Sequence, residues 1–145
     1  MIDIGFVGLG NMGAALSRRL MQNHRLHVWD KDISAIDKLV AEGALASNGP
    51  GNVAPDGVEM VFLCLPTSSE VEEVLFNENG LAEKLTSESI VIDMTTGDPI
   101  ETKSMAARLE KSGIYMIDAP VSGGVIGAEN GTIAIMVGAP ESIFL

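Results

Sequence analysis

Cysteine, aromatic residues and basic residues are all scarce in this sequence. Its 145 residues include one cysteine, 4% aromatic residues, and 9 Lys and Arg against 20 Asp and Glu, which gives a net charge of −11. The single cysteine, Cys64, excludes a disulfide within the chain and favours a reducing compartment. The acidic charge argues against nucleic acid and against anionic membrane surfaces as partners. We therefore expect a cytoplasmic protein that binds neither.

Long apolar runs are absent as well. The longest, residues 60–66, is far shorter than the roughly 20 residues that cross a bilayer. The first expected strand starts at residue 2, which leaves no room ahead of it for a signal peptide. His24 and His27 lack metal-site spacing with each other and with Cys64, so no metal is expected. Cys64 itself is best explained as a small buried residue.

Glycine, by contrast, is abundant, and short apolar segments alternate with helical patterns along the chain. Strands are expected near residues 2–7, 26–29, 59–65, 89–93, 115–118 and 133–137. Helix starts are indicated by Asp98 followed by Pro99, and by the capping-box pair of Ser69 and Glu72. This alternation requires parallel pairing with right-handed crossovers. We predict one α/β domain, residues 1–145, with a doubly wound, mainly parallel sheet of about six to eight strands.

The first thirty residues hold the most informative pattern: strand, glycine loop, helix, strand and acid. The loop consists of Gly8, Leu9, Gly10, Asn11, Met12 and Gly13, with the spacing G-x-G-x-x-G. The first glycine permits a tight turn, the second lets the backbone approach a pyrophosphate, and the third lets the helix pack near the strand. A turn that merely starts a helix is the alternative, but the complete context favours a dinucleotide site.

The acid that closes this unit is Asp30, which follows the first glycine at about the spacing expected of a ribose-binding carboxylate. A carboxylate there accepts hydrogen bonds from the adenosine ribose and repels a 2′-phosphate. The pattern therefore predicts NAD rather than NADP. Lys31, the next residue, favours the alternative cofactor NADP, because its ammonium group could turn toward a 2′-phosphate.

A second glycine-rich stretch, residues 118–132, follows a later expected strand. We interpret it as a loop, because so many glycines stabilise neither helix nor strand. Successive loop N–H groups with the hydroxyl of Ser122 can form a concave nest for a carboxylate or phosphate, although an ordinary connecting loop is an equal alternative. In a doubly wound sheet this stretch and the glycine loop lie at the same edge, beyond the carboxyl ends of the strands.

Together the two motifs resemble those of the β-hydroxyacid dehydrogenase family, of the 3-hydroxyisobutyrate dehydrogenase and tartronate semialdehyde reductase type. The resemblance rests on G-F-V-G-L-G-N-M-G at residues 5–13 and on D-A-P-V-S-G-G at residues 118–124, followed by Gly-Ala and Gly-Thr pairs. It covers essentially the whole chain. It implies a Rossmann domain that binds NAD, and a small hydroxy acid with a free carboxylate as the substrate of the complete enzyme.

The resemblance also implies roles for particular residues. The glycine loop would hold the pyrophosphate and Asp30 the adenosine ribose. Leu65 and Pro66, with Thr67 after them, would line the nicotinamide side, and Thr96 would lie near the nicotinamide ribose. Ser122, Gly123 and Gly124 would bind the substrate carboxylate.

The sequence departs from the family in length. Family enzymes are about twice as long, and their catalytic lysine lies in a later segment that has no counterpart here. The all-helical second domain, which builds the dimer, is also missing, so we expect a cofactor-binding half that is inactive alone, contains no catalytic residue and belongs to a homo-oligomeric enzyme. The alternatives are a non-catalytic nucleotide-binding or assembly module, and an enzyme for tartronate semialdehyde or a 6-phosphogluconate-type substrate. Residues 118–132 contain no basic side chain for a phosphorylated substrate.

Overall fold

The computed structural model describes residues 1–144, so only the last residue of the expected domain lies outside it. Strands and helices alternate through most of the chain. The strands are β1 (Asp3–Val7), β2 (Arg25–Trp29), β3 (Leu45–Ala46), β4 (Met60–Leu63), β5 (Ile90–Asp93), β6 (Tyr115–Asp118), β7 (Val121–Ser122) and β8 (Ala134–Ile135). The helices are α1 (Asn11–Met21), α2 (Ile33–Ala41), the 3-10 turn η1 (Pro50–Val53), α3 (Ser68–Phe76), α4 (Leu81–Lys84), α5 (Pro99–Glu110), α6 (Gly124–Asn130) and α7 (Glu141–Phe144).

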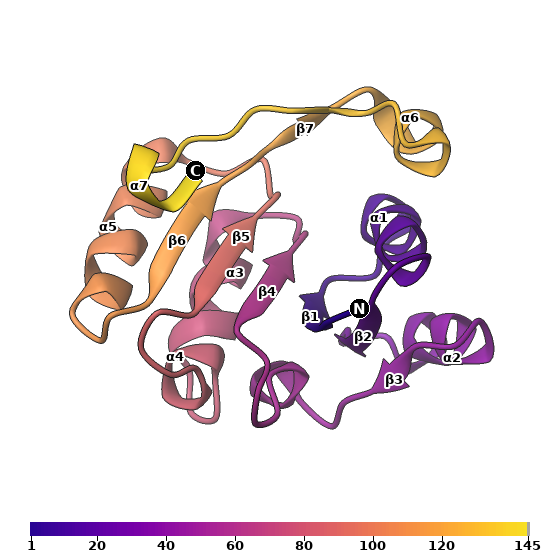
Figure 1. Ribbon diagram of the computed structural model, residues 1–145, viewed down its shortest axis with the longest axis horizontal. Helices are drawn as coiled ribbons and strands as arrows, with labels where there is room; N and C mark the ends of the chain where they lie inside the picture. The colour runs from indigo at the N-terminus through magenta and orange to yellow at the C-terminus, as the bar shows by residue number, and fades with distance from the viewer. Residues whose placement is uncertain (145) are drawn as a thin grey trace.

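The main sheet runs through the middle of the molecule (Figure 1). Within the described residues it has six parallel strands in the order β3-β2-β1-β4-β5-β6. This is the strand order of the Rossmann fold. Successive strands are added on one side of β1 up to β3, and the chain then crosses to the other side of β1 to add β4, β5 and β6, so the order of addition reverses between β1 and β4. The predicted doubly wound parallel sheet is confirmed, and the crevice at the reversal point is the place where such sheets bind ligands.

Two apolar layers cover the sheet. On one face, valines of β1 and β4 pack against α3, α4, α5 and η1. On the other face, Ile4 and Phe6 of β1 pack against α1 and α2, with α6 beside α1. Side chains alternate between the faces because successive residues of a strand point in opposite directions. The strands are therefore apolar almost throughout, as parallel strands covered on both sides should be.

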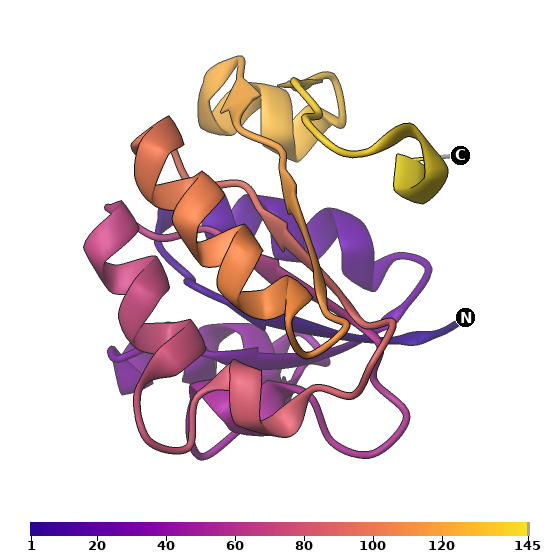
Figure 2. The ribbon, with the colours of Figure 1, turned by 90° about the vertical axis from the view of Figure 1, so that its left-hand side faces the viewer.

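The last part of the chain departs from the expected alternation. β7 and β8 pair antiparallel in a small second sheet, with Val121 opposite Ile135. In Figures 1 and 2 the segment from β7 through α6 crosses above the ends of the central strands and brings α6 next to α1. The expected strand at residues 133–137 is thus shorter than predicted and lies outside the parallel sheet. The bend at Gly123 and Gly124 and the helix α6 turn the chain back, so that β8 pairs with β7.

Local signals at the helix starts gave one correct and one wrong prediction. Asp98 caps α5 as expected, because its carboxylate accepts a hydrogen bond from the Ile100 N–H at 2.8 Å. The predicted capping box of Ser69 and Glu72 is wrong, since Thr67 occupies the cap position two residues earlier and Ser69 lies inside the first turn of α3. Ser68 is held instead by a tertiary contact, in which its hydroxyl accepts a hydrogen bond from the Asp98 N–H at 2.8 Å.

Ser17 on α1 provides a test of the packing. Its side chain is fully buried, and its hydroxyl has no hydrogen-bond partner among the described residues. Ser17→Ala removes this unpaired polar group and improves helix propensity, so it should raise the free energy of unfolding by about 1 kcal/mol. Urea denaturation measures the change.

The matched control for Ser17→Ala is Ser34→Ala on α2. The Ser34 hydroxyl donates to the Asp32 carboxylate at 2.7 Å, so its loss should lower the stability slightly. A loss of stability in Ser17→Ala would show that the hydroxyl makes a favourable interaction.

Candidate functional site

The residues after the central strands meet at one edge of the sheet. Because β1, β2, β4 and β5 are parallel, their carboxyl ends bring the glycine loop, Asp30, Leu65 and Thr95 together. The glycine loop and Leu65 lie on either side of the reversal point between β1 and β4. The structure therefore gathers the predicted cofactor residues at the crevice of the sheet.

The three glycines of the loop differ in what the fold demands of them. Gly8 has φ 101°, and a Cβ there would collide with the carbonyl of Cys64. A Cβ on Gly13 would collide with the carbonyl of Gly8. A Cβ on Gly10, in contrast, would have no atom of the described residues within 4 Å. Packing explains the first and third glycines, and it leaves the second without a structural reason.

Helix α1 begins directly after this loop. The Ala14 N–H donates to the Gly10 carbonyl at 2.8 Å as the first bond of the helix. The N–H groups of the preceding turn have no intrahelical acceptor and carry the positive end of the helix dipole. The open space above Gly10 and these N–H groups together form a cradle that suits a phosphate.

Asp30 ties the end of β2 to the glycine loop. One oxygen of its carboxylate, Oδ2, accepts a hydrogen bond from the Leu9 N–H at 2.7 Å, and the other accepts one from the Asp32 N–H at 2.8 Å. The sequence identified Asp30 only as a ribose ligand, and that role stays a prediction. Its bracing of the loop was missed, because a hydrogen bond across 21 residues leaves no local signal.

The two residues that follow Asp30 are both charged, and each interacts with a neighbouring element. Lys31 is exposed and lies 3.5 Å from a carboxylate oxygen of Glu73 on α3. Asp32 caps α2, and hydrogen bonds from the hydroxyl and N–H of Ser34 lower the pKa of its carboxyl. Asp32 therefore stays negative close to Asp30, whose carboxylate accepts a hydrogen bond from the Asp32 N–H.

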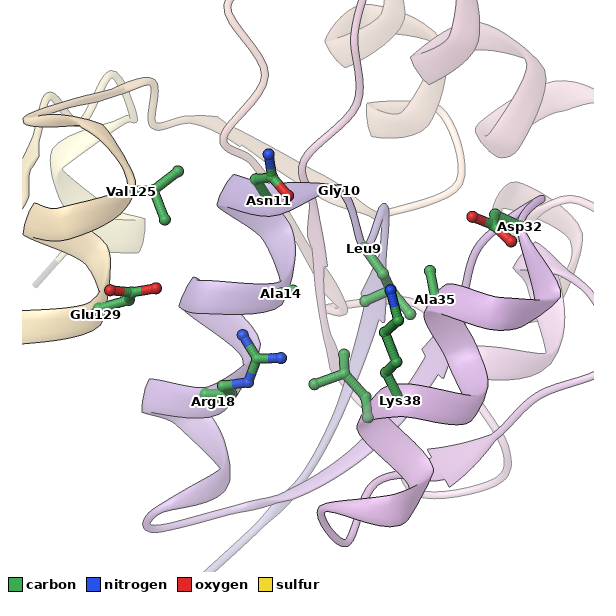
Figure 3. Close-up of a pocket in the computed structure, with 11 residues that line it drawn as sticks. Leu9, Gly10, Asn11, Ala14, Arg18, Asp32, Ala35, Lys38, Val125 and Glu129 are labelled. Atoms are coloured by element: carbon green, nitrogen blue, oxygen red, sulfur yellow. The ribbon is translucent and has the colours of Figure 1, made fainter.

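A groove of about 450 Å³ opens between α1, α2 and α6, directly beside the glycine loop (Figure 3). Gly10 and Asn11 form one end of it, and Arg18 and Lys38 project into the space between α1 and α2. Arg18 is engaged by Glu42 at 2.8 Å, a contact that raises the pKa of the guanidinium. Sequence patterns did not reveal the groove, because its walls come from three elements that are distant in the chain.

The loop after β4 is fixed by a buried acid on β5. The Leu65 N–H donates to the hydroxyl of Thr95 at 2.9 Å, and the Thr95 N–H donates to the carboxylate of Asp93 at 3.0 Å. Asp93 is 2% exposed, and burial raises the pKa of its carboxyl, as does the charge of Asp118, while the hydrogen bonds from Thr95 lower it. This chain of contacts sets the position of the loop, and no pattern in the sequence predicts it.

Of the other predicted residues of this edge, Pro66, Thr67 and Thr96 are exposed, and Leu65 is partly buried. Leu65 and Pro66 line a small pocket with Asp30 and Lys31, and their role on the nicotinamide side stays a prediction. Thr67 precedes α3, and Thr96 follows the buried Thr95 on the surface.

The second motif has a different structure from the one predicted. In place of the expected loop, residues 118–132 contain β7 and the helix α6. Gly123 and Gly124 have φ values of 130° and 65°, and these bend the chain sharply between the two elements. Helix α6 forms in spite of its glycines because its Gly127 and Ala128 are buried, with Ala128 packed among the apolar residues of α1.

Ser122, Gly123 and Gly124 are exposed at this bend. Val125, the next residue, lines the groove with Asn11 of the glycine loop, so the bend lies near the start of α1 (Figure 3). The structure therefore brings the two glycine motifs together, and the substrate-binding role of the three residues stays a prediction.

The histidines lie away from this edge. His27 Nε2 is 3.3 Å from a carboxylate oxygen of Asp3, and His24 Nδ1 accepts a hydrogen bond from the Ile2 N–H at 3.4 Å. Among residues 1–144 no group of three or more His, Cys, Asp or Glu side chains is arranged to hold a metal ion. No helix in the same part of the chain is both long and apolar enough to span a membrane.

Comparison with known proteins agrees with the geometry. Residues 3–145 match the family model described as the NAD binding domain of 6-phosphogluconate dehydrogenase. The chain is 39% identical to the 2-hydroxy-3-oxopropionate reductase of Escherichia coli, covering 99% of the chain and 49% of the reductase. It is 35% identical to the 3-hydroxyisobutyrate dehydrogenase of Pseudomonas aeruginosa, covering 99% of the chain and 48% of that enzyme.

A solved structure of Mycobacterium tuberculosis 3-hydroxyisobutyrate dehydrogenase with L-serine is similar over 99% of the chain and 48% of that protein. The TM-score is 0.91 and the sequence identity 33%. The chain thus spans about half the length of the relatives it matches.

The strand order and the glycine cradle at the reversal point define a dinucleotide-binding domain. The family model matches nearly the whole length of the chain. The chain therefore belongs to the NAD-binding domains of the 6-phosphogluconate and 3-hydroxyisobutyrate dehydrogenase type. The resemblance inferred from the two glycine motifs is confirmed.

Cys64 lies at this edge, and its thiol should be inert. Burial, with a contribution from the charge of Asp93, raises the pKa of the thiol to about 11 from an ordinary value of 9.0. Only the thiolate reacts, so iodoacetamide at pH 8 should label the folded chain about a hundredfold more slowly than the chain in denaturant. Mass spectrometry follows the labelling, and equal rates in the two states would show that the fold does not protect the thiol.

Proposed function

We propose that this chain binds NAD at the carboxyl edge of its sheet and serves as the cofactor half of a hydroxyacid dehydrogenase. The proposal rests on the open space beside Gly10. The fold leaves open space where its side chain would be, so the glycine is explained by a ligand that approaches the backbone there. The N–H groups of the first turn of α1, which have no acceptor within the helix, lie at the same space and would donate to the ligand.

The residues present fit the dinucleotide along this edge. The N–H groups of the glycine loop would bind the pyrophosphate, and Asp30 would bind the adenosine ribose while it braces Leu9. The loop containing Leu65, Pro66 and Thr67 would line the cofactor, with Thr96 toward the nicotinamide ribose. When bound, the nicotinamide ring supplies the hydride acceptor or donor of the reaction.

The substrate in this proposal is a small hydroxy acid with a free carboxylate. Ser122, Gly123 and Gly124 are exposed beside the glycine loop, where backbone N–H groups and a hydroxyl can orient a carboxylate. Support comes from the relatives, whose names include a hydroxyisobutyrate dehydrogenase and a 2-hydroxy-3-oxopropionate reductase.

Proton transfer at the substrate hydroxyl needs a general acid or base that this chain does not provide in our proposal. Lys31 is drawn to Glu73, and Lys38 lies in the groove between α1 and α2. Lys84 and Lys103 belong to α4 and α5, and Lys111 follows α5. We therefore expect the 145-residue chain to bind NADH without turning over a substrate, and we expect the complete enzyme to be a homo-oligomer.

Gly10→Ala tests the cofactor site directly. The new methyl group fits the free fold but occupies the space meant for the pyrophosphate, so the melting temperature should stay unchanged while NADH affinity falls at least about tenfold. Calorimetric titration and thermal denaturation measure the two effects.

Gly13→Ala is the matched control for that experiment. Its methyl group would collide with the Gly8 carbonyl, so it should destabilise the fold itself. If Gly10→Ala binds NADH as tightly as the unmodified chain, the pyrophosphate does not approach Gly10 and the proposed site is wrong.

Asp30→Asn tests the preference for NAD. The unmodified chain should bind NADH about tenfold more tightly than NADPH, because the carboxylates of Asp30 and Asp32 repel a 2′-phosphate. Asp30→Asn should weaken NADH binding and narrow this gap. Asp37→Asn, an exposed change of the same charge on α2, should leave the ratio unchanged.

NADP is the competing cofactor, and a similar solved structure, Psf3, holds NADP+ at 29% identity and a TM-score of 0.90. Tighter binding of NADPH by the unmodified chain would show that Lys31 turns away from Glu73 toward the phosphate.

A further inference from the structure

Three asparagines of the chain, Asn48, Asn79 and Asn130, are each followed by glycine. Asparagine is a thermolabile residue. The backbone nitrogen of the next residue can attack its side-chain amide, and glycine favours this attack because it has no Cβ in the way and the freest backbone. The three sites are alike in sequence, so the fold determines which of them can react.

The Asn79 site is held in place on both sides. The N–H of Gly80, which would supply the attacking nitrogen, donates to the Asn77 carbonyl at 2.8 Å, and the N–H of Asn79 donates to the Glu83 carboxylate at 3.0 Å. Gly80 is also buried. The backbone at this site therefore has to unfold locally before the ring can close.

The Asn130 site is fixed by a helix and by a neighbouring side chain. Asn130 is the last residue of α6, and the N–H of Gly131 donates to the Ala128 carbonyl at 3.2 Å. The guanidinium of Arg19 lies against Gly131, where a Cβ would be 2.6 Å from its central carbon. This contact leaves little room for the backbone to turn.

The Asn48 site lacks these restraints. Asn48 is exposed after β3, and within residues 1–144 no backbone carbonyl accepts a hydrogen bond from the N–H of Gly49. A Cβ on Gly49 would have no atom of the described residues within 4 Å. The flanks are anchored, because Ser47 donates to the Val28 carbonyl and Asn52 to the Gly49 carbonyl. The free step between these anchors is the peptide group that joins Asn48 to Gly49.

We propose that Asn48 is the site at which the folded chain deamidates spontaneously. The backbone nitrogen of Gly49 attacks the side-chain carbonyl carbon of Asn48 and loses its proton to the solvent. A new C–N bond forms, and the amide nitrogen leaves as ammonia. Water then opens the cyclic imide at one of its two carbonyls, which gives aspartate or isoaspartate without any oxidation or reduction.

The reaction changes the chain directly before η1. Either product carries one more negative charge than asparagine, and isoaspartate adds a carbon atom to the main chain. The end of η1 is anchored in the core by Val53, which is fully buried. The isoaspartyl form should therefore lower the melting temperature by straining this anchor.

The test is incubation of the folded chain in warm, mildly alkaline buffer, followed by peptide mapping with mass spectrometry. Each conversion of an amide to an acid changes the mass of one peptide, and fragment ions locate the residue. Asn48 should react at least about tenfold faster than Asn79 or Asn130, because their hydrogen-bonded peptide groups must first open. In denaturant the three rates should become comparable.

Gly49→Ala is the matched control, because it keeps Asn48 and hinders only the attacking nitrogen. Gly49 has an extended backbone with φ −167° and open space at its Cβ, so the variant should keep its melting temperature while the reaction at Asn48 slows. Equal rates at the three sites in the folded chain, or a faster reaction at Asn79 or Asn130, would overturn the proposal. An Asn48 that reacts only in denaturant would overturn it as well, since the fold would then protect all three sites.

Discussion

The close approach of three backbone segments is the constraint on which the site depends. The turn at Gly8 lies against the carbonyl of Cys64, and Gly13 lies against the carbonyl of Gly8. Neither contact leaves room for a Cβ. These contacts hold the start of α1 close to the ends of β1 and β4. The free N–H groups of the helix therefore lie at the reversal point of the sheet. The cradle above Gly10 is a consequence of packing at its two neighbouring glycines.

Burial of an acid beneath the edge adds a second constraint, and this one depends on pH. Asp93 holds Thr95, which holds Leu65, so the loop between β4 and α3 is positioned through a carboxylate that is almost free of solvent. The pKa of Asp93 is raised in the folded state, chiefly by burial. Its contribution to stability is therefore full below the pKa of the unfolded chain and declines as the pH rises through the folded value. The fold accepts the cost of burying this acid, and in return the loop beside the crevice is fixed.

Local and repeating signals in the sequence were enough for the fold class, while contacts between distant segments were not visible in it. Most strands of the main sheet and the Asp98 cap follow from apolar periodicity and from side chains that bond to their own backbone. The capping box at Ser69 was wrong because α3 begins at Ser68, whose hydroxyl is engaged by the distant Asp98 N–H. The glycine loop was visible because its function imposes a spacing. The bracing by Asp30 and the contact of Leu65 with Thr95 join segments that lie far apart in the chain, for which a single sequence carries no pattern.

An acidic chain that binds a pyrophosphate must supply positive potential locally, and the structure indicates which groups do so. Of the cations beside the site, Arg18 and Lys31 are engaged by Glu42 and Glu73, while Lys38 lines the groove. What faces the space above Gly10 is the first turn of α1, whose partial positive charge is held in place by the fold. The net charge of −11 and a site for an anionic cofactor are therefore compatible, because the N–H groups at the start of α1 supply positive potential locally.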